Sequence, residues 1–130
     1  MFIEQDVKLG IALLQNKIYT ANVAAGWWTN LETGQPVPKG DVTTILSKLC
    51  LVHSEVSEAC EGARKGLMDD HLPHRPMAEV ELADAVIRIL DLAGHEGYDL
   101  AGAIFEKLAY NQTRKDHKIE NRMKEGGKKA

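Results

Sequence analysis

The chain has 130 residues, enough for one domain with one hydrophobic core and too few for a two-domain enzyme. Apolar residues make up 44% and charged residues 27%, which is the composition of a folded globular protein rather than a disordered one. The formal net charge is −3, so a general electrostatic attraction to nucleic acid or to an anionic membrane is not expected. A phosphate-rich ligand would have to be bound by local cations.

Two features of the sequence indicate a cytoplasmic protein. The first apolar stretch, residues 9–14, is interrupted by a glycine and preceded by acids, so it suits neither a membrane span nor a secretion signal. Cys50 and Cys60 are ten residues apart in one predicted helix. A separation of about 15 Å along the helix axis prevents a disulfide between them, and free thiols fit a reducing compartment.

The helical spacing of apolar residues predicts an all-α chain, an antiparallel bundle of four to five helices. The first helical segment, one helix or two short ones, runs from Phe2 to about Ala25 and is ended by Gly26. A loop rich in glycine and proline follows. Asp41 is placed to cap a second helix that continues to about Gly66.

A polar connector leads to a third helix with Pro76 at its first position and Gly94 or Gly97 at its end. Asp99 is placed to cap a fourth helix through about Arg114. No strand-like alternation or internal repeat occurs in the sequence.

These boundaries predict the domain organisation. Residues 1–114 form one helical domain, with the catalytic helices at about 41–114. Residues 115–130 form a polar, basic tail that is either frayed or wraps around a partner.

The second and third predicted helices each carry two acids three residues apart. In the second, Glu55 lies beside the apolar face, with Glu58 about one turn further on and Lys48 nearby. The third helix is apolar nearly all round, so we expect it to be buried, and its polar residues fall on one narrow stripe. That stripe consists of Glu81, Asp84, Arg88 and Asp91. It is either a narrow solvent face or an acidic site, and three acids with one arginine favour the site.

Because a short connector joins these two helices, they should pack as an antiparallel pair and bring four carboxylates together. Repulsion and desolvation make this unfavourable unless a cation binds or some carboxylates take up protons. Oxygen ligands select Mg²⁺, with Mn²⁺ as a substitute, and Mg²⁺ also takes phosphate oxygens as ligands. The sequence therefore predicts a metal site formed by Glu55, Glu58, Glu81 and Asp84.

Candidate substrate-binding residues lie on the fourth helix and before the loop. Lys107, Asn111 and Arg114 share one helix face and suit phosphate oxygens, although in isolation a solvated face is an equally good interpretation. Trp27 and Trp28 precede the glycine-rich loop. Either of them can stack on a nucleobase at a pocket rim, while core packing is the more frequent fate of tryptophan.

In their order and spacing, these motifs resemble the MazG-like group of all-α nucleoside triphosphate pyrophosphohydrolases. That family is marked by E-E-x-x-E, a variable spacer and then E-x-x-D. The residues that match are Glu55 and Glu58, then, after 22 residues, Glu81 and Asp84. The family's Lys and Asn on the following helix correspond to Lys107 and Asn111. Ser54 departs from the pattern, because it replaces the first acid of the doublet.

The resemblance implies Mg²⁺-dependent cleavage of a nucleoside triphosphate between its α- and β-phosphates, giving a nucleoside monophosphate and pyrophosphate. It also implies a homo-oligomer, a dimer or tetramer, which would account for the apolar third helix. In the expected mechanism, Glu55 or Glu58 accepts the proton of the attacking water. Lys48, Lys107 and Arg114 clamp the phosphates.

Two other classes of function stay open from the sequence. A non-enzymatic helical interaction or oligomerisation module would tolerate scrambling of the acids and would not be stabilised by magnesium. A metal-dependent phosphohydrolase of another type would cut a different bond of the nucleotide. For this chain, neither nucleic acid nor a membrane is expected as partner.

Overall fold

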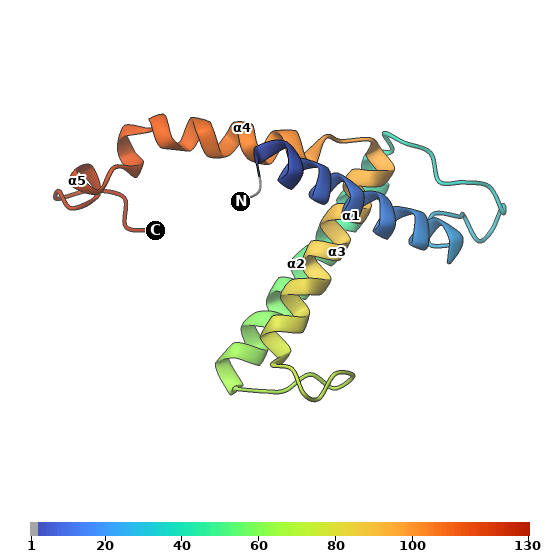
Figure 1. The fold of residues 1–130 in the computed structure, drawn as a ribbon. Coiled ribbons are helices and arrows are strands. Elements are labelled where there is room, and N and C mark those ends of the chain that lie inside the picture. Colours follow the sequence, from blue (N-terminus) through green and yellow to red (C-terminus); the bar gives the residue numbers. More distant parts are fainter. Residues whose placement is uncertain (1–2) are drawn as a thin grey trace. The chain divides into compact units, whose positions relative to one another are not determined.

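The computed structural model describes residues 3–130, so Phe2, the predicted start of the first helix, lies outside the described part. These residues form five α-helices and one short 3₁₀ helix (Figure 1). The elements are α1 Glu4–Ala24, α2 Val42–Lys65, α3 Met77–Glu96, α4 Leu100–Thr113, η1 Lys115–His117 and α5 Ile119–Arg122. Residues 3–130 contain isolated β-bridges but no strand, which confirms the all-α prediction.

Side chains at the helix ends explain why the predicted boundaries are close to the observed ones. The Asp41 carboxylate accepts a hydrogen bond from the Thr44 backbone N–H at 3.1 Å, which satisfies a free donor in the first turn of α2. Gly66 ends α2 in the left-handed region with φ 64°, a conformation that glycine adopts without strain. At α3 the prediction is off by one residue, because Pro76 is the cap and the helix begins at Met77.

The chain divides into two compact units. One unit comprises the chain up to Ala12 together with Asp99–Ala130, and the other comprises Leu13–Tyr98. In the first unit, the segment predicted as a tail contains η1 and α5. Lys8 on α1 lies over the Phe105 ring of α4, 5.3 Å from its centroid.

The unit Leu13–Tyr98 is built on the antiparallel helix pair α2 and α3 (Figure 1). A short bridge between Met68 and Pro76 closes the connector between the two helices. The second half of α1 packs on the end of α3, where a Cβ added at Gly94 would lie 2.6 Å from the Cβ of Tyr19. Only glycine permits so close an approach of the two helices.

The predicted burial of α3 on all sides is wrong for the single chain. Some of its residues are buried, with Leu90 4% exposed, but Leu82 is 54% exposed and Val86 49%. The predicted apolar face of α2 is also mostly open, since Leu46 is 58% exposed. The physical reason is that a pair of helices covers only one side of each helix. None of the helices between residues 3 and 130 combines the length and apolarity that crossing a membrane requires.

Candidate functional site

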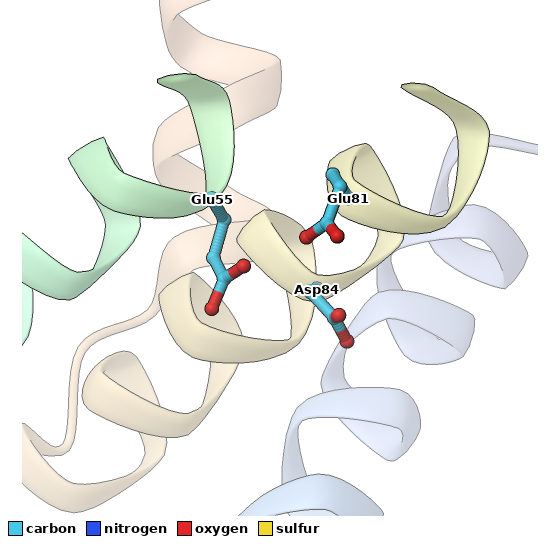
Figure 2. Close-up of side chains that lie close together, drawn as sticks. All are labelled: Glu55, Glu81 and Asp84. Carbon is cyan, nitrogen blue, oxygen red and sulfur yellow. The ribbon is translucent and has the colours of Figure 1, made fainter. Parts of the chain in front are cut away.

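Three of the four predicted acidic ligands meet between α2 and α3 (Figure 2). Glu55 comes from α2, and Glu81 and Asp84 come from one face of α3, because residues three apart are neighbours on a helix surface. One carboxylate oxygen from each residue lies within 4.8 Å of the others. Glu55 is buried, with 7% of its surface exposed, and the other two are half-buried. We call Glu55, Glu81 and Asp84 the acidic cluster.

Glu58, the fourth predicted ligand, lies beside the acidic cluster rather than in it. It is exposed, and it lines the same cavity of about 510 Å³ as the three clustered acids. The connector contributes Asp69 and His71 to this cavity. Glu58 is therefore placed to contact a ligand of the cluster while its own carboxylate stays open to solvent.

Arg88, one turn beyond Asp84 on α3, is the counter-ion of the acidic cluster. Its Nε donates a hydrogen bond to the Glu55 Oε1 at 2.5 Å, and the two form an ion pair between α2 and α3. Burial alone would raise the pKa of Glu55, but the hydrogen bond from Arg88, with support from Glu81, holds that pKa below its ordinary value. Glu55 is therefore ionised throughout the neutral range.

The pKa values of the two acids on α3 shift in the opposite direction, upward. Burial, together with the neighbouring Glu55 and Glu58 carboxylates, raises the pKa of Glu81 to about 7. Burial and the charge of Glu55 also raise the pKa of Asp84. The cluster thus holds more negative charge than its own arginine neutralises, and it responds by retaining a proton.

The acidic cluster fits a hard divalent cation. Oxygen ligands of Mg²⁺ at about 2.0–2.1 Å lie roughly 3–4.2 Å from one another, so side-chain rotations of modest size would bring the three oxygens onto one ion. The donor set consists of carboxylates alone, which is the set that Mg²⁺ and Mn²⁺ prefer. A bound cation would also replace the proton that Glu81 retains near neutral pH.

A second cavity, of about 470 Å³, borders the acidic cluster on the side of Lys48 and Arg88. Trp27 lines it with 68% of its surface exposed, so its ring is accessible to a ligand. The cavity also contains the carboxylates of Glu55 and Asp84. Two of the predicted substrate-binding residues, Trp27 and Lys48, are therefore beside the acids as expected.

Trp28 has a different position from its neighbour. It is 4% exposed, its Nε1 donates a hydrogen bond to the Asp91 carboxylate at 2.9 Å, and its ring stacks on His95 with centroids 3.7 Å apart. The Lys48 ammonium lies 4.4 Å from the centroid of the same ring. Trp28 is thus a core residue in this structure, the alternative that the sequence left open, and its packing places Trp27 and Lys48 at the second cavity.

The predicted residues of α4 belong to the other unit and have local partners there. Lys107 lies over the Tyr110 ring, 4.7 Å from its centroid, and Arg114 is paired with Asp116. The Asn111 Oδ1 is buried and has no hydrogen-bond partner among the described residues. Their role toward the acidic cluster stays a prediction.

Sequence reasoning placed Arg88 on the acidic stripe without giving it a function, and it did not assign Asp69 and His71 to the site. The spacing of Arg88 from Asp84 was a usable signal, but its pairing with Glu55 depends on the register of α2 against α3. The Ser54 hydroxyl, at the position where the resemblance fails, donates to the Leu51 carbonyl of its own helix at 2.7 Å. It takes no part in the cluster.

Comparison with known proteins adds no assignment. No family model matches the chain, and no curated protein or solved structure gives a significant match.

Proposed function

We propose that this protein is a Mg²⁺-dependent nucleoside triphosphate pyrophosphohydrolase of the MazG-like type. The observation that carries the proposal is the convergence of Glu55, Glu81 and Asp84 from two helices, with cavities on both sides of them. One cavity holds the aromatic ring and the cations that a nucleotide needs, and the other holds further acids. A purely structural acidic face would need neither.

In the proposed reaction, the acids, Lys48 and Trp27 each have a separate role. Glu55, Glu81 and Asp84 hold the metal ion, which when bound neutralises phosphate charge and lowers the pKa of water. Lys48 binds phosphate oxygens at the second cavity, where its ammonium group has an aromatic ring but no carboxylate partner among the described residues. Trp27 stacks on the base.

Of the two glutamates expected to accept the water proton, Glu58 is the better candidate. The Glu55 carboxylate is held by Arg88 and has a lowered pKa, which makes it a weak base. Glu58 is exposed and lies beside the cluster in the same cavity. Lys107, Asn111 and Arg114 stay candidates for phosphate and sugar binding.

We also propose that the active form is a homo-oligomer. Exposed apolar residues on α3 recur at spacings of four and three, at Leu82, Val86 and Ile89. On α2, Leu46 and Leu49 are three residues apart and are also exposed. A second copy of the chain would cover such stripes, and two helix pairs together make a four-helix bundle.

The test is a panel of standard and modified nucleoside triphosphates incubated with Mg²⁺, with the products separated by chromatography. We expect a nucleoside monophosphate and pyrophosphate, and no reaction in EDTA. A nucleoside diphosphate with phosphate would support the alternative of a phosphohydrolase of another type.

The alternative of a non-enzymatic interaction module would show no turnover and no response to the metal. If the acids bind Mg²⁺, the melting temperature rises with the Mg²⁺ concentration. At 100 times the Kd, the free energy of unfolding is about 2.7 kcal/mol higher than without the metal. Glu61→Gln is a matched control, because Glu61 lies on α2 and pairs with Arg64 and Lys65 rather than with the cluster.

A further inference from the structure

Arg88 occupies the boundary between the acidic cluster and the second cavity. Its partner Glu55 is nearly buried, with 9% of the side chain exposed, whereas 40% of the Arg88 side chain is exposed. Arg88 also lines the 470 Å³ cavity, together with Trp27 and Lys48. An ion pair that served packing alone would not need its cation at a cavity wall.

The contact between Arg88 and Glu55 uses a small part of the guanidinium. Nε donates to Oε1, and the guanidinium donates no other hydrogen bond among residues 3–130. A guanidinium has five N–H donors in a fork that matches a carboxylate or a phosphate with two parallel bonds. Four donors are left for a ligand in the cavity.

The same Glu55 carboxylate is a member of the acidic cluster, so the arginine and a divalent cation compete for it. Two positive groups on one carboxylate repel each other, and a buried carboxylate increases this repulsion because screening by water is weak. Binding of the cation at Glu55 therefore weakens the hold on the guanidinium. By linkage, the guanidinium also weakens the binding of the cation.

We propose that Arg88 is a polyphosphate-binding residue that exchanges partners, from Glu55 in the metal-free protein to the substrate's phosphates once a divalent cation holds Glu55. The inference rests on the proposed function and extends it to the order of binding, with the metal before the nucleotide's contact with Arg88. It gives the second cavity two phosphate-binding cations, Arg88 and Lys48, beside the exposed ring of Trp27.

The rival explanation is that Arg88 orients Glu55 for the metal and never leaves it. In that case the cation binds the free Oε2 while Nε stays on Oε1. The two explanations make opposite predictions for the metal affinity of a variant without the guanidinium.

The experiment measures binding by calorimetry for the wild type, Arg88→Gln, Arg88→Lys and the control Arg64→Gln. Arg64 pairs with Glu61 on the exposed side of α2, so the control removes an arginine ion pair away from the cluster. The probes are Mn²⁺ alone, and then an α,β-methylene nucleoside triphosphate at saturating Mn²⁺. This analogue cannot be cleaved between its α- and β-phosphates.

We expect R88Q to bind Mn²⁺ about five-fold or more tightly than wild type, because a competing cation is gone. We expect it to bind the analogue about ten-fold or more weakly, because charge-assisted hydrogen bonds are lost. R88K should keep a metal affinity near that of wild type and still lose nucleotide affinity, since an ammonium lacks the fork. Unchanged or weaker Mn²⁺ binding in a folded R88Q would overturn the proposal, as would wild-type nucleotide affinity in R88K.

Nuclear magnetic resonance on the wild type supplies a readout that does not depend on the folding of R88Q. The Arg88 Nε–H signal, identified by its absence in R88K, should shift when Mg²⁺ is added and shift again with the analogue. If the carboxyl signals of Glu81 and Asp84 respond to Mg²⁺ while Arg88 does not, the exchange of partners is refuted and the metal site stands. If no carboxyl signal responds, the proposed function itself fails.

Discussion

The carboxyl groups of Glu55 and Glu81 lie close together in the acidic cluster but have opposite electrostatic environments. Arg88 keeps Glu55 ionised, while burial and two neighbouring carboxylates raise the pKa of Glu81 to about 7. Near neutral pH, Glu81 is therefore partly protonated. The proton and a divalent cation are alternative ways to reduce the same repulsion, so metal binding should release the proton and strengthen as the pH rises.

Neutralising one acid of the acidic cluster should lower the activity without lowering the stability of the fold. Glu81→Gln or Asp84→Asn removes a metal ligand, and we expect activity to fall at least about 100-fold. The fold should stay intact or become more stable at pH 8, because a carboxylate that repels its neighbours is gone. Activity is measured at saturating Mg²⁺ and stability by thermal unfolding. Near-normal turnover in both variants would remove the acids from the active site, and E61Q should match the wild type in both assays.

The pKa of Glu81 also predicts how the stability of the metal-free protein depends on pH. An unfolded glutamate titrates near 4.5 and the folded one near 7, so between these values the folded state holds a proton that the unfolded chain has released. Its stabilising contribution is complete below about pH 4.5 and is lost as the pH rises through 7. The lowered pKa of Glu55 acts in the other direction, since its contribution is lost as the pH falls below the ordinary glutamate range.

We therefore expect the melting temperature in EDTA to decrease from about pH 5 to pH 8, and the Glu81 contribution to this decrease to be absent in E81Q. Saturating Mg²⁺ should reduce the decrease in wild type. Thermal unfolding in buffers of equal ionic strength is the measurement. Identical pH profiles for wild type and E81Q would contradict the assigned protonation of Glu81.

At the level of elements, sequence patterns predicted the helices and their ends better than the contacts between them. Asp41, Gly66 and Asp99 act locally, within one helical turn, so their effect is visible in the sequence. The pairing of Arg88 with Glu55, and the stacking of Trp28 on His95, join residues far apart in the chain. Such contacts depend on how the elements pack, which helical periodicity does not specify.

The two adjacent tryptophans in the loop between α1 and α2 have different roles, and single substitutions should separate these roles. Trp27→Ala should raise KM for the nucleotide about ten-fold with little change in kcat, because base stacking contributes to ground and transition states alike. Trp28→Ala removes a buried ring and should cost about 3–5 kcal/mol of stability. Kinetics and thermal unfolding on both variants test the division. An unchanged KM in W27A would place the nucleobase elsewhere.

At the scale of the whole molecule, the exposed apolar stripes of α2 and α3 predict an assembly of identical chains. Leu46 and Val86 are each about half exposed in the single chain, and neighbours at helical spacing extend both stripes. Light scattering after gel filtration should therefore give two or four times the chain mass of 14.4 kDa. The double variant Leu46→Glu, Val86→Glu should dissociate, because burying two carboxylates without partners is strongly unfavourable. Leu31→Glu is the control, since Leu31 is 93% exposed in the loop before α2 and belongs to neither stripe. A wild-type chain that remains a monomer at micromolar concentration would refute the assembly, and the stripes would then have to be covered within the chain.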